Sequence, residues 1–382
     1  MPAAPHYPAA VQALLYDLCD GPVAIERWDR LEPWAVARLS LSGGGGDSDR
    51  VGKSVIVKWV REDGDSRTER WRLSVELAAL RFLADDLEFA ITPRVIGADL
   101  AAGFLVLEDL APRVALDQLI CRDGVAAHRE RLAVFARALG ELGAATWGRA
   151  EAYRARCLAI SSVNPTVDGR FTSLWDQAHD TAALLGTPVT GRVASELTAA
   201  LDELSAPGPF LALSNGDAEA NNILVHESGP ADARLIDFEA AHYGHALLDG
   251  VCLHVPGPRW LSVGDPAANG LADRYRQALS RGIPEAQEDR LYGFALGAAC
   301  TSWALLRLQR LPVLDARAPG DHSRLQLIET LEATARTAEA HHTLPHLSGW
   351  LRSTATALRR RWPDADVDLT DAARFPPYSP RL

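Results

Sequence analysis

The spacing of apolar residues along the chain changes near residue 110. Before this point, short runs rich in β-branched residues are separated by turns, and a leucine-rich stretch at 68–83 has helical spacing. The expected strands cover residues 23–29, 34–41, 55–60, 94–96 and 104–108, and a first helix covers 9–19. Strands with one long helix between them predict a small α+β lobe.

Helical spacing dominates after residue 114. The expected helices cover residues 125–147, 180–204, 284–311, 322–342 and 347–361, and three short strands are expected at 210–213, 223–226 and 234–237. The proline-rich segment 369–382 predicts a surface tail. We therefore expect a two-lobed α+β chain with an N-terminal lobe at residues 1–110, a larger and mostly helical C-terminal lobe at 111–368, and the tail.

Composition narrows the class of protein. The 382-residue chain is 47% hydrophobic, enough for a core, and its formal net charge is −11. An acidic protein repels nucleic-acid phosphates, so we expect no nucleic-acid partner. We find no apolar run of about 18 residues and no secretion signal, and so expect a cytoplasmic protein with no membrane partner. The five cysteines are far apart, which favours reduced thiols.

The most informative motif covers residues 215–224 and continues at 234–239. Within it, Asp217 can take a proton from a hydroxyl, and Asn222 and Asp237 supply the oxygen ligands that Mg²⁺ prefers. Acidic turns after glycine are also common in ordinary loops. The joint spacing, however, is typical of phosphoryl transfer, and it predicts an ATP-dependent kinase with ATP and Mg²⁺ as cofactors.

Lys58 lies in a run of β-branched residues, and Glu76 lies on the helix expected after it. A lysine among apolar side chains needs a partner for its charge, and a Lys–Glu pair of this kind holds ATP phosphates in kinases. The alternative is a lysine snorkelling from a strand edge and a solvated helix glutamate.

The end of the first lobe is a candidate adenine site. Glu108 and Leu110 flank the connection between the lobes. Backbone groups there can bind the edge of an adenine ring while Ile56 and Val106 pack against its faces. An ordinary connection between lobes is compatible with the same residues.

These motifs resemble those of the aminoglycoside phosphotransferase family, which has a protein-kinase-like fold. The family pattern is His-Gly-Asp-x-x-x-x-Asn, then Ile-Asp-x-Glu and a further Asp. This chain has Asn215-Gly216-Asp217, Asn222, Ile236-Asp237-Phe238-Glu239 and Asp249. The resemblance implies that Asp217 is the catalytic base, that Asn222 and Asp237 are metal ligands, that Lys58 with Glu76 holds the phosphates, and that Asp249 supports the catalytic loop from a helix.

The chain departs from this pattern in three places. Asn215 replaces the family's histidine, which puts the rigidity of the loop in question. Glu219 stands where protein kinases have a phosphate-contacting lysine, which leaves an anionic group near the acceptor or simply a solvated glutamate. The loop at 29–34 contains no glycine. The glycine run at 43–46 misses the Walker A spacing by one residue, and it predicts a hairpin turn.

We expect transfer of the γ-phosphoryl group of ATP to a hydroxyl of a small molecule. The acceptor would be aminoglycoside-like, as in antibiotic resistance, or another polyhydroxylated or cationic compound. Kinases for amino alcohols, sugars or nucleoside antibiotics are alternatives, and so is a catalytically inactive nucleotide-binding scaffold of the same fold. For His242, His245 and His254 we expect packing or loop hydrogen bonds rather than a zinc site.

Overall fold

The structure is a computed structural model of the chain. It describes residues 7–18, 23–31, 35–43, 52–61, 65–161, 170–369, 371 and 373–381. The expected hairpin turn at 43–46 lies outside these ranges except for Gly43, and so does part of the glycine-free loop, residues 32–34.

Helices and strands follow each other in the order expected, with some additions. The elements of the first half are α1 (Tyr7–Leu18), β1 (Val23–Arg30), β2 (Val36–Gly43), β3 (Ser54–Trp59), α2 (Ser66–Arg81), β4 (Val95–Asp99), β5 (Phe104–Glu108), β6 (Val114–Ala115), α3 (Leu116–Asp123), α4 (Arg129–Thr146), α5 (Ala150–Ile160) and α6 (Arg170–Leu185). Those of the second half are α7 (Gly191–Ser205), β7 (Leu211–Ser214), β8 (Ile223–Val225), β9 (Arg234–Leu235), β10 (His242–His245), α8 (Leu247–Gly250), β11 (Trp260–Ser262), α9 (Leu271–Leu279), α10 (Asp289–Leu308), α11 (Leu311–Asp315), α12 (His322–Ala340), α13 (Pro345–Arg361) and β12 (Ser379–Pro380).

The described residues form two compact units, and the smaller one is not a continuous piece of chain. It combines Met1–Val114 with Glu151–Pro165 and Arg234–Ala241, and the remaining residues form the larger unit. The sequence suggests a boundary near residue 110, but it does not reveal that two later segments belong with the first. One of these later segments carries Asp237.

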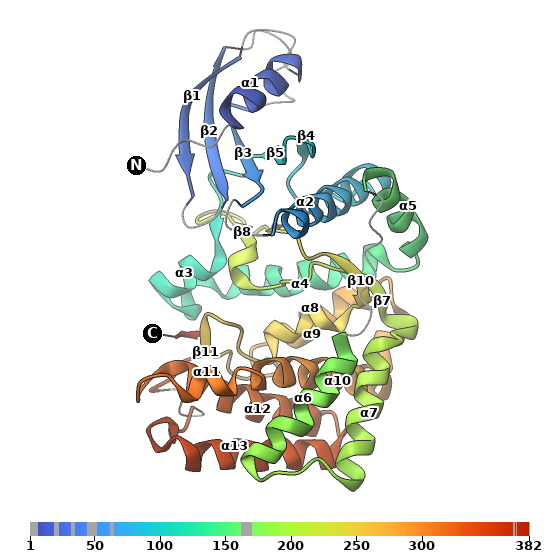
Figure 1. Cartoon of the computed structure of the whole chain (residues 1–382), viewed down its shortest axis with the longest axis vertical. Helices are drawn as coiled ribbons and strands as arrows, with labels where there is room; N and C mark the ends of the chain where they lie inside the picture. Colours follow the sequence, from blue (N-terminus) through green and yellow to red (C-terminus); the bar gives the residue numbers. More distant parts are fainter. Residues whose placement is uncertain are drawn as a thin grey trace. The chain divides into compact units, whose positions relative to one another are not determined.

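A five-stranded antiparallel sheet with the order β1-β2-β3-β5-β4 forms the smaller unit. Alternate residues of β3, such as Val55 and Val57, join the apolar core that α1 covers (Figure 1). Strand periodicity places Ile56 and Lys58 on the other face. Val106 pairs with Val57 and lies in the core, so its expected place beside Ile56 is wrong.

The residue after β5, Asp109, has a buried carboxylate that is hydrogen-bonded to other strands of the sheet. Arg38 of β2 donates to both oxygens of Asp109, at 2.8 and 3.1 Å, and the Ser54 hydroxyl donates at 2.6 Å. The side chain of Asp109 is 2% exposed. The chain therefore leaves the sheet along a path fixed by polar contacts.

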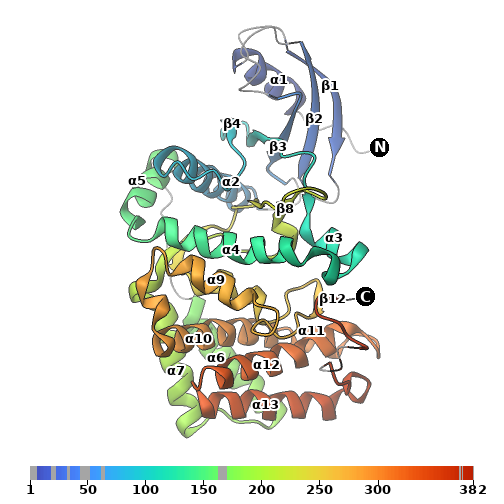
Figure 2. The ribbon, with the colours of Figure 1, turned by 180° about the vertical axis from the view of Figure 1, so that it is seen from behind.

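The larger unit is a stack of helices. In both Figure 1 and Figure 2, α4, α9, α10, α12 and α13 follow one another from top to bottom, and α4 contacts α9, α10 contacts α12, and α12 contacts α13. The single helix expected at 180–204 is wrong. Gly186, which has φ +69°, and Pro188 separate α6 from α7.

Helix α10 is unusually long and apolar. Among the described residues it is the one helix long and apolar enough to cross a membrane by length and composition. Of its most apolar 18-residue window, 78% is buried inside the structure. A core helix of a globular unit has the same properties, so this observation gives weak support to a membrane span.

The C-terminal segment is not wholly a surface tail. Strand β12 pairs with β11, and the side chain of Tyr378 is 3% exposed. Its ring packs edge-on against Trp260, with the ring centroids 5.4 Å apart. These apolar contacts attach the described part of the segment to the larger unit.

Two glycines offer a test of the helix packing. A Cβ at Gly140 of α4 would collide with the backbone carbonyl of Tyr275, whereas a Cβ at Gly349 of α13 would meet nothing within 4 Å. We expect Gly140→Ala to lower the free energy of unfolding by about 1–3 kcal/mol through overpacking. Gly349→Ala should raise it by about 0.5–1 kcal/mol because alanine is the better helix former. Urea denaturation measures both, and equal effects would contradict the α4–α9 packing.

Candidate active site

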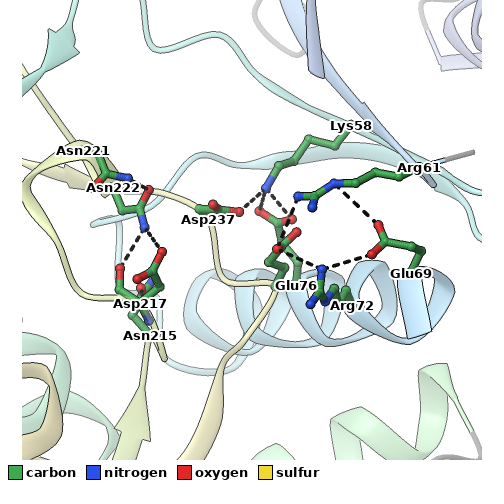
Figure 3. A network of polar contacts seen from close by, with 11 residues as sticks. Lys58, Arg61, Glu69, Arg72, Glu76, Asn215, Asp217, Asn221, Asn222 and Asp237 are labelled. Carbon is green, nitrogen blue, oxygen red and sulfur yellow. Dashed lines mark hydrogen bonds and ion pairs between the residues drawn. The ribbon is translucent and has the colours of Figure 1, made fainter. Parts of the chain in front are cut away.

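Lys58 lies at the centre of an ion cluster in the smaller unit. Its ammonium group donates to both carboxylate oxygens of Glu76 at 2.7 Å and to Oδ1 of Asp237 at 2.6 Å (Figure 3). The side chains of Lys58, Glu76 and Asp237 are 15%, 1% and 34% exposed. The snorkelling alternative is therefore excluded, and the expected Lys–Glu pair is present.

Burial and charge act in opposite directions within this cluster. Burial lowers the pKa of Lys58, but Glu76 and Asp237 outweigh it and hold that pKa above its ordinary value. Burial raises the pKa of Glu76, and Lys58 opposes the rise. Lys58 thus keeps its charge because the two carboxylates are present, whereas at Glu76 the effect of burial exceeds that of Lys58.

The residue type at position 58 is unusual for this chain. The sequence contains two lysines, Lys58 and the exposed Lys53, and the rest of its 39 Lys and Arg residues are arginine. An ammonium is a compact point charge with three donors, whereas a guanidinium is a planar fork. In this cluster all three donors of Lys58 are directed at carboxylate oxygens.

The position and conformation of the backbone around Asp237 bring its carboxylate to Lys58. The segment just before it is attached to the smaller unit, since the N–H of Leu235 donates to the carbonyl of Ile91 at 2.8 Å. Asp237 itself has φ +63°, in the left-handed region that few non-glycine residues adopt. A strained backbone at a partly exposed carboxylate is typical of a functional site.

A second group of charges, which the sequence did not predict, extends the cluster. Glu239 lies 3.7 Å from Arg61 and 3.8 Å from Arg72. Both arginines also pair with Glu69 (Figure 3). Burial and the neighbouring Asp237 raise the pKa of Glu239. These pairs connect the segment after β9 to α2, which also carries Glu76.

In the larger unit, the loop after β7 holds Asp217 by hydrogen bonds from Asn222. The amide of Asn222 donates to the Asp217 carbonyl at 2.8 Å and to its Oδ2 at 2.9 Å (Figure 3). Gly216 has φ +84°, a conformation that favours glycine. The turn leaves Asp217 exposed while Asn222 is buried, so the carboxylate is accessible and its backbone is fixed.

Asp249 of α8 supports this loop through hydrogen bonds, as expected. Its carboxylate accepts from the Ser214 hydroxyl and from the Asn215 N–H. Burial raises the pKa of Asp249 to about 6, and the hydrogen bonds from the loop oppose that rise. The Asn215 side chain accepts the N–H of Asp217 at 3.2 Å, so the residue that replaces histidine also helps to hold the loop.

The expected adenine contacts have mixed surroundings. The Glu108 carboxylate accepts from the Arg94 N–H at 3.1 Å, and the Leu110 carbonyl accepts from the Arg113 N–H at 3.1 Å. Leu110 is buried, and Ile56 is half-buried on the face that also carries Lys58. A nucleotide-binding role for Ile56, Glu108 and Leu110 stays a prediction.

The oxygens expected to bind metal have suitable chemistry. Asn222 presents an amide oxygen and Asp237 a carboxylate, which are the hard donors that Mg²⁺ takes. The Asn222 oxygen accepts one hydrogen bond from Asn221 at 2.8 Å, and a carbonyl oxygen has a second lone pair. Within the described ranges, no group of three or more His, Cys, Asp or Glu side chains forms a metal site. A divalent ion held by either side chain would need further ligands, such as nucleotide phosphates or water.

The three histidines are packing residues in the part of the chain that the structure describes. His242, His245 and His254 are all buried. The His245 ring stacks on Phe210 and lies 3.4 Å from the Glu203 carboxylate. Burial lowers the pKa of His254 to about 3, so this ring is neutral.

Similar solved structures identify the fold. A protein from Ralstonia eutropha named as a candidate aminoglycoside phosphotransferase is 15% identical, with a TM-score of 0.50 over 92% of this chain and 98% of that one. This chain has the protein-kinase-like fold. The streptomycin–ATP complex of APH(2″)-IIa (13% identity, TM-score 0.49, 83% and 95% coverage) and choline kinase LicA from Streptococcus pneumoniae (13%, 0.48, 87% and 99%) also match. No family model matches the sequence, and no curated protein matches it significantly.

The contribution of the Lys58 cluster to the free energy of unfolding can be measured without any substrate. We expect Lys58→Met to lower the free energy of unfolding by about 3–5 kcal/mol, because Glu76 is left buried and unpaired. The loss should be smaller at pH 5 than at pH 8, since a protonated Glu76 needs no partner. Lys53→Met is the matched control and should have almost no effect.

A double variant separates charge from packing. Adding Glu76→Gln to Lys58→Met removes the unpaired charge, so at least half of the lost stability should return in urea denaturation. A double variant as unstable as Lys58→Met would show that the ion pair is not what the cluster contributes.

Proposed function

We propose that this chain is an ATP- and Mg²⁺-dependent phosphotransferase that moves the γ-phosphoryl group to a hydroxyl of a small molecule. The acceptor is aminoglycoside-like or another polyhydroxylated or cationic compound. The observation that carries the proposal is the buried Lys58 held between Glu76 and Asp237, in a chain that otherwise uses arginine. This arrangement fixes an ammonium where it can bind phosphate oxygens.

Each residue of the proposed machinery has one task. Lys58, oriented by Glu76, binds nucleotide phosphates. Asn222 and Asp237 hold Mg²⁺, which neutralises phosphate charge when bound. Asp217 accepts a hydrogen bond from the acceptor hydroxyl, orients its oxygen for in-line attack and takes its proton as the bond to phosphorus forms. Little covalent chemistry is required of the protein, so positioning accounts for most of the rate.

The hydrogen bonds around Asp217 support its role as the base. Asn222 and Asn215 hold the backbone of the loop, yet the Asp217 carboxylate is exposed. A general base must be within hydrogen-bond reach of the hydroxyl that it deprotonates. A rigid loop that presents an accessible carboxylate meets this requirement without a further conformational change of the residue itself.

An inactive nucleotide-binding scaffold is the second candidate, motivated by Asn215 in place of histidine. The hydrogen bond from the Asp217 N–H to Asn215 weakens this argument, because the replaced residue still holds the loop. A screen of ADP formation over many hydroxylated acceptors, with Mg²⁺, separates the two candidates. Nucleotide binding without turnover on any acceptor would favour the scaffold. A cytoplasmic location forms part of the proposal. A role in antibiotic resistance is also part of it and requires that the acceptor be an antibiotic.

Asp217→Asn should lower kcat by about 10²–10⁴ while ATP binding is retained. Asparagine keeps the shape of the side chain but cannot accept the proton. Steady-state kinetics on any acceptor from the screen measure the loss, with Asp202→Asn, at an exposed position on α7, as the control. Near-normal turnover in Asp217→Asn would remove this residue from the mechanism.

The two-lysine sequence allows a direct test of nucleotide binding. In Lys53→Arg, Lys58 is the only lysine left, so an acyl-phosphate derivative of ATP can acylate a lysine side chain at that position alone. We expect labelling of Lys58 that excess ATP suppresses, measured by peptide mass spectrometry. Labelling that ATP does not reduce would contradict the phosphate-binding role.

Removal of metal should stop turnover. EDTA is expected to abolish phosphoryl transfer, and added Mg²⁺ to restore it. Asp237→Asn removes the charged ligand and should raise the Mg²⁺ concentration needed for half-maximal rate by at least about tenfold. The same Mg²⁺ dependence in wild type and Asp237→Asn would exclude Asp237 as a metal ligand.

A further inference from the structure

The larger unit contains three arginines without a carboxylate partner, and we call them the arginine cluster. Arg307 lies in α10, Arg310 stands directly before α11, and Arg381 directly follows β12. No ion pair joins any of them to an Asp or Glu in the part of the chain that the structure describes. Their positive charges are therefore not balanced by direct contact with a neighbouring side chain.

Two of these guanidinium groups meet at one oxygen. Arg307 donates to Oε1 of Gln326, and Arg381 donates to the same atom at 3.3 Å. Arg381 also donates to the Ser323 hydroxyl at 3.3 Å. Amide and hydroxyl oxygens are neutral, and a guanidinium has five N–H donors. These contacts therefore neither balance the two charges nor use most of their donors.

Other arginines in the C-terminal part of the same unit do have carboxylate partners. The pairs are Arg317 with Asp321, Arg324 with Asp364, Arg359 with Glu332 and Arg361 with Asp315. The sequence has 50 Asp and Glu residues against 39 Lys and Arg residues, so carboxylates are not scarce. The composition of the chain therefore does not explain three unpaired arginines in one place.

The charges of the arginine cluster act on one another. Burial, and then the charges of Arg310 and Arg381, lower the pKa of Arg307 to about 10, and Glu219 opposes the fall. Burial and the charge of Arg310 also lower the pKa of Arg381, and Asp321 opposes that fall. Neither acid forms an ion pair with the cluster within the described ranges. Cations held this close repel one another, and a bound anion would remove the repulsion.

The C-terminal strand brings Arg381 to this place. Strand β12 pairs with β11, and the N–H of Arg381 donates to the carbonyl of Arg259 at 2.8 Å. In both Figure 1 and Figure 2, this end of the chain lies beside α11, and Arg310 stands at the start of α11. The segment expected to be a surface tail therefore supplies one of the three cations.

The residue on which the arginines meet also holds a loop in place. Gln326 is 0% exposed, and its amide donates to the carbonyls of Gly257 at 2.8 Å and of Trp260 at 2.6 Å. A Cβ on Gly257 would overlap the carboxylate of Glu219. Glu219 is 8% exposed, so it is not the solvated glutamate considered from the sequence. The oxygen shared by the arginines is therefore fixed by a buried hydrogen-bond network.

We propose that Arg307, Arg310 and Arg381 bind a phosphate group, with the Ser323 hydroxyl as a further donor. Guanidinium groups bind phosphate through paired N–H donors, and a dianion balances more than one of them. The proposal goes beyond the phosphotransferase reaction and does not depend on it. The phosphate is either free inorganic phosphate or a monoester group on a small molecule, and both have the same chemistry at the arginine cluster.

Calorimetric titration of the full-length protein with inorganic phosphate, without nucleotide, tests the proposal. Wild type should bind phosphate. Arg310→Gln and Arg381→Gln should each weaken binding by about 10–100-fold, because each removes charged donors. Arg290→Gln is the matched control, since Arg290 is an exposed arginine of α10, and it should bind phosphate as wild type does.

Thermal unfolding separates a binding site from a structural role. Without phosphate, the Tm of Arg310→Gln should equal or exceed that of Arg290→Gln, because one of three repelling charges is removed. Phosphate should raise the Tm of wild type as its concentration increases, and should not raise that of Arg310→Gln. A Tm of Arg310→Gln below that of the control, without phosphate, would show a structural role and overturn the proposal.

A second titration identifies the source of the phosphate. Glucose 6-phosphate that binds more tightly than inorganic phosphate indicates a phosphate carried by a small molecule, and equal affinities indicate the free anion. Either result supports the site when Arg381→Gln weakens both. Affinities that neither Arg310→Gln nor Arg381→Gln changes overturn the proposal. The absence of phosphate binding in wild type overturns it as well, and is the result expected if a carboxylate outside the described ranges already balances the cluster.

Discussion

The smaller unit depends on the contact between one ammonium and two carboxylates. Lys58 comes from the sheet, Glu76 from the long helix and Asp237 from a segment far along the chain, and the three are joined by bonds of 2.6–2.7 Å. Charges this poorly solvated are tolerated only together. The cluster therefore fixes α2 and the segment after β9 to the sheet, and the same groups are the ones proposed to bind phosphate and metal.

In the larger unit, hydrogen bonds fix the loop after β7 while the Asp217 carboxylate stays exposed. Asp249, Asn215 and Asn222 hold the backbone around Asp217 from three directions. The neighbouring Glu219 is instead held by shape, through Gly257 and Gln326. One carboxylate is thus exposed and the other nearly buried, within two residues.

The sequence predicted the strands of the smaller unit and the Lys58–Glu76 pair well, because strand periodicity and apolar runs are local signals. It did not predict features that depend on contacts between residues far apart in the chain. The face on which Val106 lies depends on its register with Val57, and the membership of Asp237 in the smaller unit depends on Lys58. The break between α6 and α7 was visible in Gly186 and Pro188, but helical spacing on both sides concealed it. Nothing in the residues near Glu239 indicated its pairing with Arg61 and Arg72.

The return of the segment Arg234–Ala241 to the smaller unit has a consequence for biosynthesis. As the chain leaves the ribosome, the sheet and α2 emerge long before Asp237 does. Until then the nascent N-terminal part has Lys58 and Glu76 but lacks the second carboxylate, that of Asp237. The smaller unit therefore cannot be completed as an early folding module, and a ribosome-bound fragment that ends at residue 110 would have all five strands of its sheet but an incomplete Lys58 cluster.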